Sequence, residues 1–446
     1  MKKLIERVTV WDGDSAILEN GALLIDNGRI EAVLTPEELA THDPPSDVEQ
    51  INGAGKLAIP GLINAHTHLY SSLARGMSLP ETAPTSFTEI LEQLWWRLDR
   101  ALDEQSIRMS GLIGAMEAAR CGITTLIDHH ASPYNVTNSL SVLREAVCED
   151  VGLRGLFCYE VSDRDGAAIA AAGIDENLRF LASHEAQDLM SSGLFGLHAS
   201  FTLSDKTLAR VASSLPEKVG VHIHVAEGPE DEEQCIAEHG IRIAMRLDRF
   251  GLLRPNSILV HCLHLDEAER DLIAERDAIV VHNPRSNMNN AVGVFDLDGF
   301  LNKGLLVGLG TDGLGGNLLS ELFTAGILQK VSTGAPLAAG FGDLKRLLFD
   351  NNPLILGRLL GVKIGRIAPG YPADIALLDY HPPTPLSGDT VFGHLLFGPA
   401  VHALRVSDLF VAGNEVLRNG VFTGLDEERI YAQAREEAAR LWGRAA

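Results

Sequence analysis

Eight short apolar runs, rich in Val, Ile and Leu, recur along the middle of this 446-residue sequence, with helix-like stretches between them. The runs cover residues 62–66, 122–130, 152–161, 193–201, 219–227, 256–265, 278–284 and 305–313. Strands that alternate with helices are typical of a parallel sheet, and eight such units are the number that closes a (β/α)8 barrel. An open doubly wound sheet is the competing architecture, but no GxGxxG loop follows the first run. The sequence therefore predicts an α/β fold built around a TIM barrel.

The two ends of the chain differ in pattern from its middle. Residues 1–56 contain short alternating runs separated by Gly and Asp-Asn turns, which predicts a small antiparallel sheet. A similar pattern returns after residue 362. We therefore expect a small β-sandwich domain formed from residues 1–56 and 363–425, a barrel over residues 57–362, and a C-terminal helix over residues 426–446.

Charge and composition limit the partners of this chain. It carries 37 Lys and Arg against 60 Asp and Glu, a net charge of −23, which disfavours nucleic acid and anionic membranes as partners. No apolar run approaches the ~20 residues that span a bilayer, and charges interrupt the start of the chain at once. The five cysteines are scattered without a CxxC pair, as expected in a reducing compartment. We expect a cytoplasmic protein that forms a dimer or tetramer and acts on a small molecule.

Ionisable side chains stand near the C-terminal ends of the predicted barrel strands, although the strands of a parallel sheet are otherwise apolar. In chain order they are His66, His68, Asp128, His129, His130, Glu160, His198, His222, His224, Glu227, His261, His264, His282 and Asp312. The C-terminal strand ends of such barrels converge on one face, where active sites are found. We therefore expect several of these groups to meet in one pocket.

Four of these residues form a candidate metal site. His66 and His68 are two residues apart, so both imidazoles lie on one face of a strand and suit a divalent ion. His224 and Asp312, on other strand ends, would complete a set of nitrogen and oxygen ligands. Because the set contains no thiolate, zinc is the first expectation, with iron or manganese allowed. The alternative is a histidine pair that is simply packed or exposed.

Other residues are candidates for catalysis and substrate binding. Glu227 lies three residues beyond His224, so it can approach a metal-bound water and move its proton without ligating the metal. An exposed loop glutamate is the alternative for Glu227. His261 would stand across the metal from Glu227 and polarise the substrate, and His198 would line the pocket wall and bind substrate.

The remaining histidines and acids are less informative. His129 and His130 could face the pocket, or they could be buried and hydrogen-bonded. His264 is expected to be structural. Glu160 and Asp163 are acidic pocket candidates that only a structure can place.

Five segments resemble the motifs of the metal-dependent amidohydrolase superfamily, in the same order. They read PGLINAHTH at 60–68, HVAE at 224–227, HCLHL at 261–265, HNPRSN at 282–287 and GTDG at 310–313. The resemblance covers nearly the whole chain, including the divided small domain. It is strongest to the branch that contains cytosine, guanine, S-adenosylhomocysteine and chlorotriazine hydrolases.

This resemblance implies a mononuclear metal site. The implied ligands are His66, His68, His224 and Asp312. The counterpart of Glu227 shuttles the proton, that of His261 orients water and substrate, and Asp312 would also act as a second proton acceptor. Binuclear relatives carry a carboxylated lysine on the fourth strand, but the run at 193–201 contains no lysine. One metal ion is therefore expected.

The implied reaction is hydrolytic deamination of a purine-like or other heterocyclic amine. Metal-bound hydroxide would attack the amino-bearing carbon, Glu227 would protonate the ring nitrogen, and ammonia would leave. Hydrolysis of an amide, cyclic amide or ureido C–N bond is an alternative, and a catalytically inert metal- or ligand-binding paralogue is a second. The HxE and PCxxC pattern of nucleic-acid base deaminases is absent.

Two departures from the branch leave the substrate open. Gly315-Gly316-Asn317 stands where many deaminases carry a Ser-Asn pair, and Met288-Asn289-Asn290 follows Asn287 where relatives commonly carry a different pair. Such loops shape the pocket, so no relative's substrate is transferred to this chain.

Overall fold

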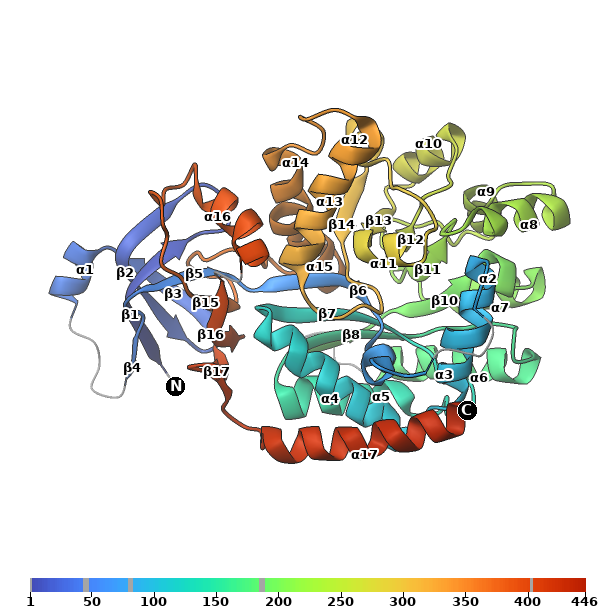
Figure 1. Ribbon diagram of the computed structural model, residues 1–446, viewed down its shortest axis with the longest axis horizontal. Coiled ribbons are helices and arrows are strands. Elements are labelled where there is room, and N and C mark those ends of the chain that lie inside the picture. Colours follow the sequence, from blue (N-terminus) through green and yellow to red (C-terminus); the bar gives the residue numbers. More distant parts are fainter. Residues whose placement is uncertain (1, 43–47, 79–82, 184–188, 402–403) are drawn as a thin grey trace.

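A closed ring of eight parallel strands forms the centre of the protein (Figure 1). The structure is a computed structural model that describes residues 2–42, 48–78, 83–183, 189–401 and 404–446. The ring strands are β6 (Leu62–Thr67), β7 (Ile123–His130), β8 (Arg154–Tyr159), β10 (Phe195–Ala199), β11 (Val221–Val225), β12 (Ile258–His261), β13 (Ile279–His282) and β14 (Leu306–Leu309). Consecutive strands pair in parallel within two groups, β6 to β8 and β10 to β14.

Two isolated bridges join these groups into a barrel. Thr67 pairs with Asp312 between the first and last strands, and Val161 pairs with Leu197 between the third and fourth. A short additional strand, β9 (Ser191–Gly193), pairs with β8 immediately before β10 begins. The predicted α/β fold with a TIM barrel is therefore confirmed.

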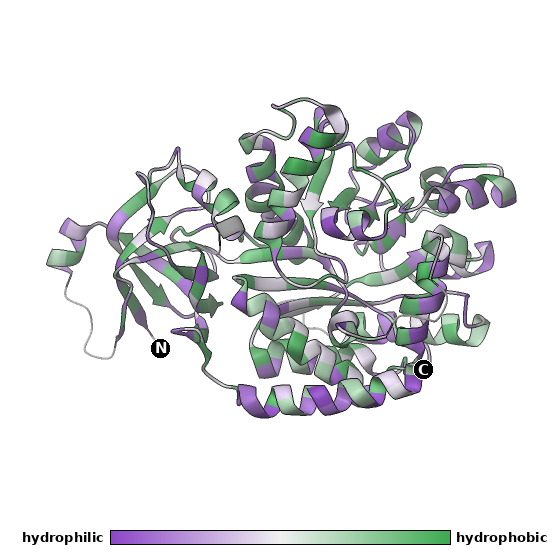
Figure 2. Ribbon diagram, in the orientation of Figure 1, coloured by the Kyte–Doolittle hydropathy of each residue, from purple (hydrophilic) through white to green (hydrophobic). Residues whose placement is uncertain are grey.

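The apolar character of the eight runs follows from their burial. Every residue of the eight ring strands is buried, because helices cover the outside while side chains fill the inside. Figure 2 shows hydrophobic residues concentrated along these strands and hydrophilic residues on the outer helix faces. The ionisable groups at the strand ends are exceptions to this pattern and need partners.

Helices follow most barrel strands and form the outer layer. Their bounds are α2 (Phe87–Ile90), α3 (Trp96–Arg100), α4 (Glu104–Arg120), α5 (Ser139–Arg144), α6 (Ala167–Ala182), α7 (Asp205–Ser214), α8 (Pro229–His239), α9 (Ile243–Arg249), α10 (Glu267–Glu275), α11 (Pro284–Asn289), α12 (Leu297–Asn302), α13 (Leu318–Thr333), α14 (Phe341–Lys345) and α15 (Asn352–Leu360). Side-chain caps fix several starts: Asp103 and Asp266 form capping boxes at α4 and α10. None of these described helices is long and apolar enough to cross a membrane.

Both ends of the chain contribute to a second, nine-stranded sheet. Its N-terminal strands are β1 (Lys3–Trp11), β2 (Ile17–Asp26), β3 (Arg29–Leu34), β4 (Glu49–Asn52) and β5 (Lys56–Pro60), with helix α1 (Pro36–Thr41) after β3. Its C-terminal strands are β15 (Ile375–Asp379), β16 (Arg405–Val411), β17 (Asn414–Arg418) and β18 (Val421–Phe422), with helix α16 (Val391–Phe397) after β15. Antiparallel pairing of β15 with β5 joins the two sets.

The predicted domain boundaries remain predictions, although the sheet bears on one of them. Strand β5 continues to Pro60, beyond the expected boundary at residue 56, and leads through Gly61 directly into β6. Residues 1, 43–47 and 402–403 of the predicted small domain lie outside the described residues. Helix α17 (Glu427–Ala445) returns from this sheet to the barrel, where Trp442 donates to the carbonyl of Leu73 at 2.8 Å (Figure 1).

A buried ion pair links the barrel to the small sheet. Arg154 of β8 donates to both carboxylate oxygens of Asp374, at 2.7 and 3.2 Å, and also to Thr125 at 3.0 Å. The second partner of Asp374 is the backbone N–H of Ala412, at 2.8 Å. Both charged side chains are almost fully buried, so removing one leaves the other uncompensated in a medium of low polarity.

Replacing Asp374 by Ala should lower the free energy of unfolding by about 3–5 kcal/mol, because Arg154 would remain buried without its counterion. Urea denaturation followed by circular dichroism measures the change. The matched control is Asp379→Ala, which removes an exposed carboxylate from β15, the strand that begins immediately after Asp374. Equal unfolding midpoints for the two variants would contradict a stabilising role of the pair.

Candidate active site

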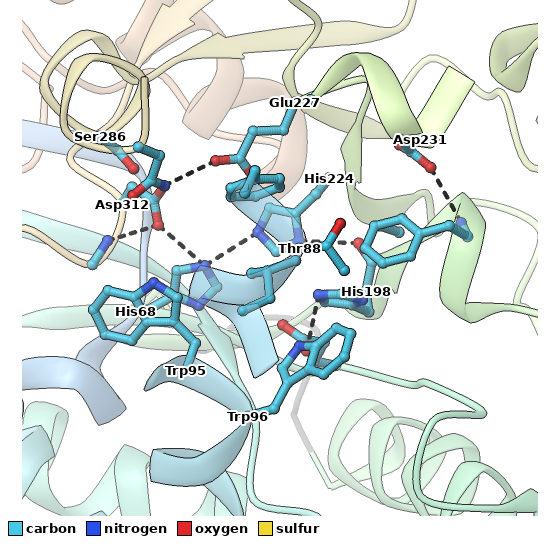
Figure 3. Close-up of a pocket in the computed structure, with 18 of the residues that line it drawn as sticks. His68, Thr88, Trp95, Trp96, His198, His224, Glu227, Asp231, Ser286 and Asp312 are labelled. Atoms are coloured by element: carbon cyan, nitrogen blue, oxygen red, sulfur yellow. Dashed lines mark hydrogen bonds and ion pairs between the residues drawn. The ribbon is translucent and has the colours of Figure 1, made fainter. Parts of the chain in front are cut away.

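Three imidazoles converge where the first and fifth barrel strands end. The candidate ligand atoms of His66, His68 and His224 all lie within 4.8 Å of one another. Nε2 of His68 is 3.1 Å from Nε2 of His224. Asp312, which follows β14, places Oδ1 at 3.3 Å from Nε2 of His68 and at 3.8 Å from Nε2 of His66. The structure thus brings together the four residues that the sequence suggested as ligands, and Figure 3 shows three of them pointing toward one another.

Hydrogen bonds at the opposite ring nitrogens orient these imidazoles. Nδ1 of His68 donates to the carbonyl of His129 at 2.6 Å, and Nδ1 of His224 donates to the carbonyl of His198 at 3.0 Å. Nδ1 of His66 is 2.9 Å from Nε2 of His222. The two bonds to carbonyls leave Nε2 of His68 and of His224 facing the shared centre with a lone pair, the arrangement that metal-binding histidines adopt.

Buried atoms without partners show that this cluster fits a cation. Among the described residues, Nε2 of His66 is buried and has no hydrogen-bond partner. Burial lowers the pKa of His66 and His224 well below the ordinary value, and the neighbouring histidines lower it further. The rings are therefore neutral, as ligation requires. The donor set of three imidazoles and one carboxylate suits zinc.

A second group of ionisable residues stands beside the cluster. Nε2 of His261 lies 3.3 Å from Oε2 of Glu227 and 3.7 Å from Oδ2 of Asp312. Asn287 accepts a hydrogen bond from Nδ1 of His261 at 2.7 Å, which fixes the ring. Asn290 donates to Oε1 of Glu227 at 3.2 Å, so Oε2 is the oxygen that faces the centre.

Burial and neighbouring charges shift the pKa of Glu227 and the pKa of Asp312 in opposite directions. Burial raises the pKa of Glu227; His261 opposes this effect and Asp312 adds to it. Burial would also raise the pKa of Asp312, but His68 and His261 hold it below the ordinary value. Glu227 is thus the better proton carrier and Asp312 the better anionic ligand.

Strained backbone accompanies the site. Ala226, His261, Cys262 and Asp312 have φ values of 48°, 71°, 56° and 54°, in the left-handed region that favours glycine. Such residues cost roughly 1–3 kcal/mol each and cluster at functional sites. All four belong to the strand ends that carry Glu227, His261 and Asp312, so the strain accompanies the placement of these side chains.

The other predicted pocket residues divide into those that reach the pocket and those that do not. His198 lines it, and its Nδ1 donates to the hydroxyl of Thr202 at 2.7 Å. Glu160 also lines it, whereas Asp163 accepts hydrogen bonds from Ser204 and Thr207 of the loop and helix that follow β10.

Three further histidines have structural surroundings. His130 binds Ser132 at 2.9 Å, and His264 donates to the carbonyl of Val292 at 2.7 Å, the structural role expected for His264. His282 is buried against Phe295, with ring centroids 4.6 Å apart, and burial lowers its pKa to about 3.

Aromatic side chains from outside the strand-end pattern form much of the pocket wall. They include Phe87, Trp95 and Trp96, from the segment that joins β6 to α4, and Figure 3 shows both tryptophans beside the polar cluster. Arg164 also lines the pocket, lies 5.2 Å from the Trp96 ring centroid and forms an ion pair with buried Asp99. None of these residues belongs to the strand-end pattern, and the repeated Trp95-Trp96 was the available sequence signal for the aromatic wall.

Known proteins are similar to this chain over nearly its whole length. A protein from Pyrococcus furiosus named 5-methylthioadenosine/S-adenosylhomocysteine deaminase is 31% identical over 96% of this chain and 98% of its own. A 5'-deoxyadenosine deaminase from Methanothermobacter thermautotrophicus is 30% identical over 96% of this chain and 97% of its own. An adenosine deaminase from Xanthomonas campestris, solved with bound zinc, has a TM-score of 0.82 and 25% identity over 98% of each chain.

The chain also matches the sequence pattern of a protein family. The Amidohydrolase family pattern matches residues 57–416, which include the whole barrel and all the residues of the candidate site. The expected resemblance to metal-dependent amidohydrolases is therefore confirmed, and this chain belongs to the Amidohydrolase family.

Proposed function

We propose that this protein is a metal-dependent aminohydrolase that deaminates a purine-like or other heterocyclic amine. The observation that carries the proposal is the placement of Glu227, His261 and Asp312 directly beside three converging imidazoles. Family membership supports hydrolysis of a C–N bond, and the names of the relatives support an amine on a purine-like ring.

His66, His68, His224 and Asp312 are the residues that would hold one divalent ion, with zinc the first candidate and iron or manganese the alternatives. When bound, such an ion supplies Lewis acidity that brings the pKa of a coordinated water toward neutrality. The absence of lysine from β10 supports a single ion in this centre.

Glu227 is proposed to move the proton. Its Oε2 faces the centre while Oε1 is held by Asn290, so Oε2 can take a proton from the attacking water. The same atom can then deliver that proton to the ring nitrogen beside the attacked carbon. The amino group leaves as ammonia after it accepts a second proton, which comes from the hydroxyl added to the attacked carbon as that group becomes the carbonyl. Asp312 is the neighbouring carboxylate that can transfer this proton.

His261 and His198 are proposed to orient the substrate. Because Asn287 fixes the ring of His261 through Nδ1, Nε2 is directed at the reacting centre and, when protonated, donates to the attacked group. His198 contributes to the opposite wall. Trp95, Trp96 and Phe201 surround the space with aromatic surface that suits a planar ring.

Incubation of the metal-loaded protein with a panel of heterocyclic amines, amides and ureido compounds tests the proposal. Ammonia release together with product mass distinguishes deamination from ring opening and from amide hydrolysis. Turnover restricted to amides or ureido compounds would reject deamination. A protein that binds metal but converts no compound would support an inert binding role.

His66→Ala should reduce the bound metal to well below one equivalent, because it removes one of the proposed ligands. Elemental analysis after dialysis against a weak chelator measures the change. The control is His239→Ala, which changes a histidine on α8, outside the pocket. Full occupancy in His66→Ala would exclude His66 from the ligand set.

Glu227→Gln should retain the metal but lower kcat by about 100-fold or more, because the amide cannot carry the proton. Steady-state rates on any substrate found in the panel, together with metal content, measure the two effects separately. A near-normal rate with full metal occupancy would assign the proton transfer to another residue.

Asn287→Ala should lower activity by about 10- to 100-fold, because His261 loses the partner that fixes its ring. Asn287→Asp keeps an acceptor at the same position and should retain more activity. Asn302→Ala, at an exposed asparagine of α12, is the control. If the Ala and Asp variants were equally impaired, orientation of His261 would not explain the loss.

Two expectations remain predictions. Analytical ultracentrifugation would determine whether the chain forms a dimer or tetramer. Fractionation of cells that produce the protein would test its cytoplasmic location.

A further inference from the structure

The carboxylate of Glu160 faces the pocket without a described hydrogen bond. Glu160 follows β8, is 5% exposed and lines the same pocket as Glu227 and Asp312. Its nearest described partners are Nδ1 of His129 at 3.3 Å, a guanidinium nitrogen of Arg164 at 3.6 Å and Nε2 of His198 at 3.8 Å. None of these contacts has hydrogen-bond geometry, and Nδ1 of His129 is itself buried without a partner.

The neighbouring histidines are poorly placed to donate to this carboxylate. Nε2 of His129 donates to the carbonyls of Leu197 and His222, at 3.1 and 3.0 Å, so this N–H is engaged away from Glu160. The Thr202 hydroxyl donates to the carbonyl of Ala199, so it accepts from Nδ1 of His198. Nε2 of a neutral His198 then lacks a proton. Neither imidazole has a described hydrogen bond to Glu160.

The third neighbour, Arg164, is already engaged. It forms a closer ion pair with buried Asp99 and another with Asp165 at 3.2 Å, and its guanidinium lies over the Trp96 ring. A carboxylate out of water without a close donor is costly. A donor on the bound ligand would complete the hydrogen bonding of this carboxylate.

The distances from Glu160 to the histidine cluster indicate which part of the substrate carries that donor. A Glu160 oxygen lies within 4.8 Å of a ring nitrogen of His68, and within the same distance of a ring nitrogen of His224. These two imidazoles belong to the centre at which water attacks under the proposed function. The group that meets Glu160 is therefore attached close to the reacting carbon and not on a distant substituent.

The charge of the pocket restricts the substrate further. Its described lining contains five carboxylates, at Glu160, Glu227, Glu230, Asp231 and Asp312. Among these described lining residues, Arg164 has the only permanent positive charge, and it is paired with carboxylates. A phosphate or carboxylate substituent would meet repulsion from this wall.

We propose that Glu160 is a substrate-contact residue that accepts a hydrogen bond from a ring N–H beside the amino-bearing carbon. It selects neutral or cationic amino-lactam heterocycles over rings that present an acceptor at this position and over anionic derivatives. This inference rests on the proposed deamination and specifies its substrate class.

Matched compounds test the inference on the unmodified protein. Guanine and isocytosine carry an N–H beside the amino-bearing carbon, whereas 2-aminopurine and 2-aminopyrimidine carry ring acceptors on both sides of the same carbon. We expect kcat/KM to be about 10- to 100-fold higher for the N–H member of each pair, the value of one hydrogen bond to a charged group. Guanosine should likewise be preferred over guanosine 5'-monophosphate. Equal kcat/KM values within both ring pairs would overturn the inference.

The variant Glu160→Gln identifies the residue responsible. It should reduce kcat/KM about 10- to 100-fold for the N–H compounds, mainly by raising KM. It should change kcat/KM for the acceptor compounds much less. Glu233→Gln removes the same charge from an exposed position on α8 and should leave both values unchanged. An equal loss on all compounds would overturn the contact. Loss of a second metal ion from Glu160→Gln would also overturn it, because the carboxylate would then be a ligand.

One further measurement keeps the outcomes separable. Quenching of tryptophan fluorescence in the slow Glu227→Gln protein measures binding of each compound without turnover, since Trp95 and Trp96 line the pocket. If Glu160→Gln does not fold, the comparison of compound pairs on the unmodified protein still decides. Failure of every amine to react rejects the proposed function, whereas turnover without N–H preference rejects only the role of Glu160.

Discussion

Closure of the barrel between its first and last strands is the constraint on which the site depends. The bridge between Thr67 and Asp312 places the end of β14 beside the end of β6. Thr311 and Asp312 also donate their backbone N–H groups to the carbonyl of His66, at 3.0 and 3.1 Å. A carboxylate from position 312 is thereby held 3.3 Å from an imidazole at position 68. Without closure, these groups would stand at opposite edges of an open sheet.

Burial then determines how the converging groups behave. Removing imidazoles from water disfavours their charged forms, and the carbonyls of His129 and His198 select which ring nitrogen faces the centre. The second of these carbonyls belongs to His198, whose own side chain lines the pocket. One strand end therefore both orients a histidine of the ligand cluster and contributes a side chain to the pocket wall. This double use explains why polar residues occur at the ends of so many adjacent strands.

Much of the site was predictable from sequence because the C-terminal ends of all strands in a parallel barrel lie on the same face. The HxH pair at 66 and 68, together with His224, Glu227, His261 and Asp312, could be grouped by position alone, and the structure brings them together. The aromatic wall of the pocket was harder to predict from the sequence. Trp96 and Asp99 lie on a short helix between β6 and α4, and their meeting with Arg164 is a long-range contact that no local periodicity encodes.

The sequence by itself determined the repeated strands, the α/β barrel and the order of its polar strand ends, because continuous apolar runs and the chemistry of each residue are local properties. Only the tertiary structure decided which histidines have a free nitrogen and which are fully hydrogen-bonded. It also decided that Glu160 faces the pocket while Asp163 caps a neighbouring loop. Those differences arise from ångström-scale contacts between distant segments, and they separate a residue that can meet substrate from one that supports the fold.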